Sequence, residues 1–243
     1  MLLNENFTYI HDAETESEIW DRFFGHMQKN YGFTSMLYAF SHSFYTTKRL
    51  GLTKSLFIKQ NHPKDYVEYI GSDNFLNNDL CVAAVVESNE PFLWHTAFDH
   101  PNATDLQRKQ ALVDKRFGMD IGVSFALPFA NGRGIGGLGL CMGQSTVVGF
   151  MHIWDNQQLQ ITQEVRRFDA LMRPAIVRNR LRLSSREREI LAYSAGGMIA
   201  KEIAAHLGLK PKTIYNTLER ARASMQAAST MEAVAKAYIY DLI

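Results

Sequence analysis

Residues 184–225 read SSREREILAYSAGGMIAKEIAAHLGLKPKTIYNTLERARASM, and this stretch decides the fold of the C-terminal part of the chain. Ser184 and Glu187 form the S-x-x-E pattern of a capping box, in which each side chain binds a backbone amide at the start of a helix. The glycine pair at 196–197 can adopt the left-handed backbone that ends a helix. We therefore expect a first helix from about residue 184 to residue 195.

Two more helices are expected after the glycine pair. Ile199, Ile203 and Leu207 recur at helical spacing, and Gly208 is placed to end this second helix. Pro211 suits the first position of a third helix, where an amide hydrogen would have no partner within the helix. Two helices joined by a short turn that contains glycine are typical of a helix-turn-helix, which places its second helix in the major groove of DNA.

The third helix combines an apolar stripe with a polar face. Lysine and arginine neutralise phosphates, threonine and tyrosine can donate to phosphate oxygens, and asparagine can reach a base edge. A solvated surface helix is the alternative, and the helix, turn and proline before it count against that alternative. The residues that we predict to contact DNA are Lys210, Lys212, Thr213, Tyr215, Asn216 and Arg220. A fourth helix, from about Met231 to Tyr240, is expected to pack on these three or to pair across a dimer.

The charge of the chain is unevenly distributed. The 243 residues carry a net charge of +1, but residues 182–243 contain nine Lys or Arg against six Asp or Glu. That segment therefore carries +3, and the rest of the chain carries −2. A small basic module joined to a mildly acidic body is expected when only one part of a protein meets phosphates.

Several protein classes are not supported by the sequence. The first residues, MLLNENFTYIHD, lack the basic and apolar segments of a signal peptide, and no apolar run approaches the roughly 20 residues of a spanning helix, so we expect a cytoplasmic protein. Cys81 and Cys141 lie far apart without CxxC spacing, so neither a disulfide nor a metal site is expected. Hydrolase and nucleotide-binding motifs are absent, so we predict no enzyme, no catalytic residue and no cofactor.

The first 175 residues alternate between helical and strand patterns. NGRGIGGLGL at 131–140 lies between two strand patterns, so Asn131-Gly132 predicts a hairpin turn rather than a nucleotide-binding loop. Helices are expected at residues 14–30, from Pro63 onward, at 104–116 and at 161–178, and strands at 35–44, 55–58, 122–129 and 135–142.

These elements predict an α+β protein with two domains. Helices on both faces of a small antiparallel sheet form an α-β-α sandwich. We expect an α-β-α domain at residues 1–175, a linker at 176–183, and an all-helical DNA-binding domain at 184–243.

The C-terminal stretch resembles the DNA-binding domain of the LuxR family of bacterial regulators. Lys210 stands where that family usually has a serine or threonine cap, and Thr217 stands where a histidine is common. The resemblance implies a transcription regulator that binds double-stranded DNA as a homodimer, with RNA polymerase as a further partner. The matching positions are Glu187, Leu191, Gly197, Glu202, Ile203, Ala204, Leu207, Thr213 and Ile214.

The N-terminal domain resembles the autoinducer-binding domain of the same family, which recognises acyl-homoserine lactones. The spacing of Tyr66, Asp79, Trp94 and Gly122 reproduces four landmark positions, and Pro91 precedes Trp94 as the pattern expects. The resemblance implies that Asp79 accepts a hydrogen bond from the amide of the ligand. It also places Tyr66 where the family has a tryptophan that donates to the lactone carbonyl.

The predicted pocket departs from the family at three further positions. His62 stands where a tyrosine usually binds the acyl carbonyl, Ile70 replaces a second tyrosine, and Leu80 replaces a proline. Tyr69 is placed to substitute for that second tyrosine, and Ser124 falls where small polar pocket residues are common. The departures favour an unusual ligand or a lactone with an atypical chain. The ligand-binding residues that we predict are Asp79, Trp94, Tyr66, His62, Tyr69, Ile70 and Ser124.

Two alternatives remain open for this domain. Asp79 also suits a helix cap, and Trp94 also suits a hydrophobic core. A buried carboxylate needs a donor, which either a ligand amide or a protein hydroxyl can supply. The protein is therefore either a regulator controlled by a small signalling molecule or an orphan regulator that fills its own pocket and binds DNA without a ligand.

Overall fold

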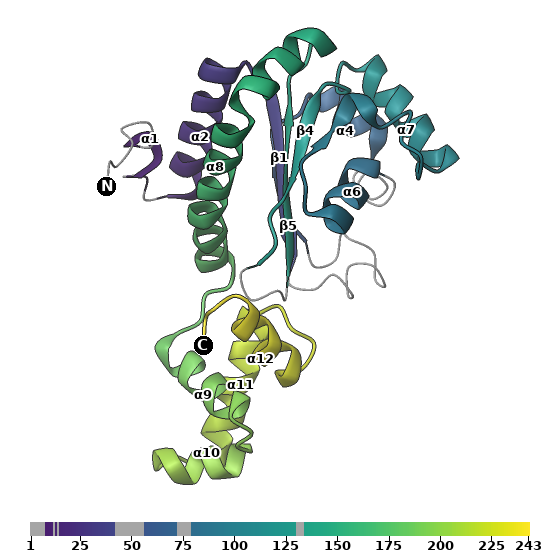
Figure 1. Ribbon diagram of the computed structural model, residues 1–243. Helices are drawn as coiled ribbons and strands as arrows, with labels where there is room; N and C mark the ends of the chain where they lie inside the picture. Colours follow the sequence, from purple (N-terminus) through teal and green to yellow (C-terminus); the bar gives the residue numbers. More distant parts are fainter. Residues whose placement is uncertain (1–7, 12, 14, 42–55, 72–78, 130–133) are drawn as a thin grey trace. The chain divides into compact units, whose positions relative to one another are not determined.

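The computed structural model describes residues 8–11, 13, 15–41, 56–71, 79–129 and 134–243 (Figure 1). The chain folds into two compact units, Met1–Met172 and Arg173–Ile243. The first unit has the predicted α-β-α arrangement and the second is all-helical, so the predicted α+β fold is confirmed.

The described part of the first unit contains a five-stranded antiparallel sheet in the order β2-β1-β5-β4-β3. Its strands are β1 (Ser35–Ser41), β2 (Leu56–Gln60), β3 (Phe92–Leu93), β4 (Gly122–Ala126) and β5 (Ile135–Cys141). β4 and β5 pair as the hairpin pattern predicts, whereas the turn expected at Asn131-Gly132 lies outside the described residues. Residues 42–44 of the first predicted strand also lie outside them.

Helices lie on both sides of this sheet (Figure 1). α2 (Glu16–Tyr31) and α8 (Val147–Arg180) cover one side, while α4 (Lys64–Ile70), α6 (Leu80–Ser88) and α7 (Asp105–Arg116) lie on the other. The short α1 (Thr8–His11) precedes α2, and the 3-10 helix η3 (Trp94–Thr96) follows β3.

The side of the sheet that faces α2 and α8 is a closed hydrophobic core. Alternate strand residues point to this side, and Met36, Tyr38 and Leu140 are fully buried there. Phe23 of α2 stacks on Phe168 of α8 with ring centroids 4.2 Å apart. This dense layer fixes the position of the sheet.

The opposite side of the sheet is less completely covered. In the central strands β1 and β5, the burial of side chains alternates, and Leu37, Ala39, Ile135, Gly137 and Gly139 remain partly exposed. Central strands of a sheet with helices on both faces are usually buried on both sides. The sheet therefore keeps accessible surface on the side of α4, α6 and α7.

Helix α8 is longer than predicted. It begins at Val147 instead of residue 161, and it continues through Pro174 to Arg180. Residues 176–180, the first part of the predicted linker, are therefore helical. The physical reason is that Ala175, Ile176 and Val177 are buried, so the apolar face of the helix continues beyond the proline.

The second unit contains α9 (Ser185–Ala195), α10 (Ala200–Leu207), α11 (Pro211–Ser224) and α12 (Thr230–Ile239). The capping box is present, because Ser184 Oγ accepts the Glu187 amide at 3.2 Å and the Ser184 amide donates to Glu187 Oε2 at 2.8 Å. Gly208 ends α10 with φ 65°, and Pro211 begins α11, as predicted. Ile190, Ile203, Ala204 and Ile214 form the buried core.

One expectation for this unit is wrong. Ile199 was expected on the apolar stripe of the second helix, but it precedes α10 and is 60% exposed. Its extended backbone turns the side chain away from the core, while Glu202 Oε2 accepts its amide at 2.9 Å.

Candidate functional site

Tyr66 lies at the centre of a polar cluster on the partly accessible side of the sheet. It projects from α4, is 3% exposed, and donates from its hydroxyl to Asp114 Oδ1 of α7 at 2.8 Å. Gln110 Nε2 donates to the same oxygen at 2.7 Å. Tyr66, which stands where the family has a lactone-binding tryptophan, is thus bonded through its hydroxyl to Asp114, a residue that no sequence motif indicated.

Asp79 lies immediately before α6, where its Oδ1 accepts the Cys81 amide at 2.7 Å. This bond is the local helix-cap contact that the sequence left open for Asp79. Burial raises the pKa of the Asp79 carboxyl, and hydrogen bonds from the Cys81 and Val82 backbone partly offset that rise. Asp79 therefore combines a capping contact with a poorly solvated carboxyl group.

Asp79 and Asp114 influence each other electrostatically. Burial, together with the smaller effect of the Asp79 carboxylate, raises the pKa of Asp114 to about 7. Asp79 immediately precedes α6 and Asp114 lies on α7, and Tyr66 of α4 lies within the electrostatic influence of both. The pKa of Asp114 therefore reflects both its own burial and a second carboxyl group.

Trp94 connects this cluster to the sheet. Its Nε1 donates to Ser124 Oγ of β4 at 2.8 Å. A Cβ atom at Gly122 would lie 2.3 Å from the Leu140 carbonyl oxygen and 2.7 Å from the Trp94 ring. At Gly139, a Cβ atom would lie 3.0 Å from the same ring. The indole therefore lies directly on two glycines of the sheet, which explains why position 122 requires glycine.

His62 lies at a second polar contact beside the sheet. Its Nδ1 is 2.7 Å from Ser35 Oγ of β1, and its backbone amide donates to Gln60 Oε1 at 2.6 Å. Burial lowers the pKa of His62 to about 4, so the ring is neutral at physiological pH. A neutral imidazole has one donor and one acceptor nitrogen, and it can pair with either kind of ligand group.

The remaining predicted pocket residues lie at the end of α4. Tyr69 is 57% exposed, and its ring contacts Phe117 with centroids 5.2 Å apart. Ile70 is the last residue of α4, and its side chain lies outside the described residues. The structure thus brings Tyr66, Asp79, Trp94 and Ser124 together around the sheet and leaves Tyr69 at the surface.

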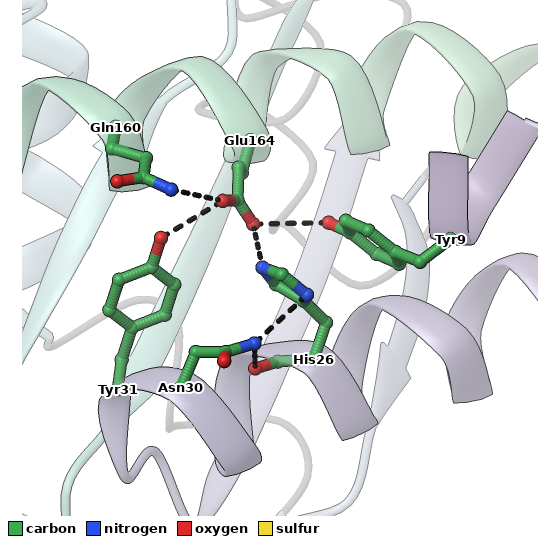
Figure 2. Close-up of polar contacts among 6 residues, drawn as sticks. All are labelled: Tyr9, His26, Asn30, Tyr31, Gln160 and Glu164. Atoms are coloured by element: carbon green, nitrogen blue, oxygen red, sulfur yellow. Dashed lines mark hydrogen bonds and ion pairs between the residues drawn. The ribbon is translucent and has the colours of Figure 1, made fainter. Parts of the chain in front are cut away.

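A second polar cluster, not anticipated from the sequence, lies between α1, α2 and α8 (Figure 2). Glu164 of α8 is 1% exposed and accepts hydrogen bonds from Tyr31 at 2.9 Å and from Tyr9 at 3.1 Å. His26 Nε2 lies 2.8 Å from Glu164 Oε2, and the Tyr9 ring stacks on the His26 ring at 3.9 Å. Asn30 Nδ2 lies 3.0 Å from His26 Nδ1 and donates to the His26 carbonyl oxygen at 3.0 Å.

The predicted DNA-contacting residues share one exposed face of the second unit. Lys210 precedes α11, and the other five lie on it, all with exposed side chains: Lys212, Thr213, Tyr215, Asn216 and Arg220. The opposite face of α11 carries Ile214 and Ala221, which are fully buried. A helix with one apolar face and one polar face can pack on α10 through the apolar face and contact a DNA duplex through the polar face.

Thr217 occupies the buried side of α11. It is 1% exposed, and its Oγ1 donates to the Thr213 carbonyl at 2.9 Å. Arg220 Nη2 donates to Thr217 Oγ1 at 3.3 Å. The threonine that stands in place of the frequent histidine therefore orients Arg220.

Both parts of the sequence match known families. Residues 15–165 match the family described as the autoinducer binding domain, and residues 181–237 match the bacterial regulatory proteins of the luxR family. The chain belongs to the LuxR family of bacterial regulators.

Solved structures of this family have the same fold. This LuxR-type chain is similar to the crystal structure of Escherichia coli SdiA, with 19% identity, coverage of 96% of this chain and 94% of that chain, and a TM-score of 0.65. A complex of SdiA with octanoyl-rac-glycerol matches with 19% identity and a TM-score of 0.61. The match covers 95% of this chain and 91% of that chain.

The N-acylhomoserine lactone dependent factor CepR2 from Burkholderia cenocepacia is also similar, with 17% identity, coverage of 71% of this chain and 93% of that chain, and a TM-score of 0.55. The comparison with curated proteins gave no match.

The LuxR resemblance predicted from the sequence is confirmed. The protein is a DNA-binding transcription regulator with an autoinducer-binding domain, and its families are not those of enzymes. Among the described residues, no helix has an apolar stretch long enough to pass through a bilayer.

Proposed function

We propose that this LuxR-type regulator is controlled by a small signalling molecule bound between the sheet and helices α4, α6 and α7. The ligand is an acyl-homoserine lactone or an unusual substitute for one. The observation that carries the proposal is the partial exposure of Leu37, Ala39 and Gly137 in the central strands β1 and β5. Accessible apolar surface beside central strands suits the acyl part of a ligand.

The polar end of this ligand is proposed to lie at the cluster around Tyr66. Asp79 accepts the amide of the ligand, and Trp94 packs against the head group with Ser124 behind it. His62, which is neutral and has both a donor and an acceptor nitrogen, binds the acyl carbonyl. Tyr69 and Ile70, at the end of α4, border the site.

Ligand binding is proposed to act through the stability of the first unit. A molecule that binds only the folded state adds about 2.7 kcal/mol of stability at a hundred times its dissociation constant. Two carboxyl groups with raised pKa values make this region costly to fold when it is empty. The ligand offsets that cost, and the folded first unit then supports DNA binding by the second.

DNA is proposed to contact the exposed face of α11. A homodimer would bind two half-sites, one for each copy of the chain. Val148 and Leu159 of α8 are 80% and 78% exposed, which supports a contact with a second copy of the chain. The regulator is proposed to act in the cytoplasm, with RNA polymerase as a further partner. The contact residues on DNA are Lys210, Lys212, Thr213, Tyr215, Asn216 and Arg220.

A thermal-shift panel with acyl-homoserine lactones of different chain lengths, run beside DNA binding by the full chain, tests the proposal. A ligand is expected to raise the melting temperature of the wild type and to tighten DNA binding. Asp79→Asn is expected to lose the response, whereas Glu87→Gln, an exposed change on α6, is expected to keep it. No stabilisation by any compound or cell extract, together with ligand-independent DNA binding, supports the orphan regulator instead.

A further inference from the structure

Thr217 and Arg220 form a hydrogen-bonded pair on α11. The Thr217 side chain is 1% exposed, and its Oγ1 donates to the Thr213 carbonyl at 2.9 Å. A hydroxyl has a single hydrogen, so the same oxygen acts as the acceptor for Arg220, whose Nη2 lies 3.3 Å away. The buried threonine therefore presents an acceptor to the guanidinium group, and the helix backbone sets the direction of that acceptor.

Arg220 lies at the flank of the exposed face of α11. Ile214 is fully buried and marks the inner side of this helix. With 3.6 residues per turn, Asn216 lies about 160° from Ile214 around the helix axis, near the centre of the exposed face. Arg220 lies about 120° from Ile214, on the side of Thr217. The bond to Thr217 thus holds the guanidinium group at the edge of the exposed face.

A cation at this edge is placed to meet a phosphate. The major groove of B-DNA is about 12 Å wide, and a helix with its side chains is about 10–12 Å across, so the flanks of the helix face the sugar-phosphate walls. The positive charge of Arg222 is paired with Glu219, at 3.2 Å. Arg220 is held by a neutral hydroxyl instead, which leaves its charge and its other N–H groups for phosphate oxygens.

We propose that Thr217 is a positioning residue for DNA binding, which holds Arg220 toward a phosphate at the wall of the major groove. An arginine side chain that is already held loses less conformational entropy when it meets the phosphate. Because a phosphate contact carries no sequence information, Thr217 sets the affinity for all duplexes. This inference rests on the proposed contact between α11 and DNA, and it adds a buried residue that does not itself touch the duplex.

Fluorescence anisotropy of the full chain with two labelled duplexes of unrelated sequence tests the inference. Thr217→Val replaces the hydroxyl with a methyl group, and the Thr213 carbonyl keeps its backbone hydrogen bond within α11. This variant is expected to bind both duplexes about threefold to tenfold more weakly, the cost of ordering one arginine side chain. Thr217→Ser keeps the hydroxyl and is expected to restore most of the wild-type affinity.

A double-mutant cycle with Arg220→Ala separates positioning from a structural role. Arg220→Ala is expected to weaken binding and to reduce the salt slope by about 1. Adding Thr217→Val to this variant is expected to have no further effect, because no arginine remains to be positioned. A structural role of Thr217 would weaken binding in both backgrounds. Thr230→Val, the same change at the start of α12, is the matched control and is expected to bind DNA as the wild type does.

The outcomes separate this inference from the proposed function. Wild-type affinity in Thr217→Val, or an equal loss with and without Arg220, overturns the positioning role and leaves the contact of α11 with DNA. An unchanged salt slope in Arg220→Ala, or losses that differ between the two duplexes, overturns the phosphate contact of Arg220. A wild type that binds neither duplex, even at low salt, overturns the inference and counts against the proposed DNA contact as well.

Discussion

Replacing Glu164 with alanine removes the acceptor that ties α1 and α2 to α8 (Figure 2). Tyr31 is 2% exposed, so its hydroxyl is left without a partner at a cost of about 1–3 kcal/mol. Tyr9 and His26 are only partly buried, and water can replace much of what they lose. The methylene groups of the Glu164 side chain also lose their packing contacts. Together, these losses are expected to lower the free energy of unfolding of the first unit by about 3 kcal/mol.

Urea unfolding followed by tryptophan fluorescence measures this loss selectively. The chain has three tryptophans, Trp20, Trp94 and Trp154, and all lie in the first unit. With a denaturant slope of about 2 kcal/mol per molar urea, the unfolding midpoint is expected to fall by about 1.5 M. The fluorescence change therefore reports the unit that contains the cluster.

Glu68→Ala, an exposed change on α4, is the control for the Glu164 variant. Its free energy of unfolding is expected to stay within about 0.5 kcal/mol of the wild-type value, as is usual for exposed substitutions. If Glu164→Ala shifts the midpoint no further than this control, the cluster does not hold the helices together and the reasoning is refuted.

Three further predictions follow from the geometry. Gly122→Ala is expected to destabilise the first unit by at least about 2 kcal/mol, since its Cβ would overlap the Leu140 carbonyl and the Trp94 ring; an unchanged melting temperature contradicts the close packing. The pKa of Asp114 is raised to about 7 from 3.8, so the folded wild type holds a proton that the unfolded chain releases, and its stability falls as pH rises through this window. The melting temperature of Asp114→Asn is therefore expected to rise relative to that of the wild type as pH increases from about 4 to about 7. If the two melting temperatures change in parallel with pH, Asp114 does not have a raised pKa. Lys212→Ala is expected to weaken binding to all DNA sequences and to reduce the salt slope of binding by about 1, which a titration at several salt concentrations checks; an unaltered slope excludes a phosphate contact.

The helix-turn-helix could be predicted because its signals are local. The capping box at Ser184, the left-handed Gly208 and Pro211 at the start of α11 each act within one or two turns of the chain. Ile199 was misplaced because helical spacing alone does not say where the helix begins. The first turns of α8 were missed for a related reason, since Gly149 and the valine pair before it weaken the helical pattern.

The polar clusters could not be predicted, because their members are far apart in the sequence. Tyr9 and Glu164 are 155 positions apart, and Tyr66 and Asp114 are 48 apart. The family spacing pointed to Tyr66 and Asp79, but Asp114 appears in the sequence only as one polar residue of an amphipathic helix. Its significance comes from the tertiary contact with Tyr66, which lies on a different helix.

Native mass spectrometry of the intact protein, purified from the cells that produce it, tests the central claim most directly. The account predicts an added mass of one small molecule per chain, which is released on denaturation and whose removal weakens DNA binding. A chain with no added mass that binds DNA as tightly as the untreated preparation would contradict control by a ligand.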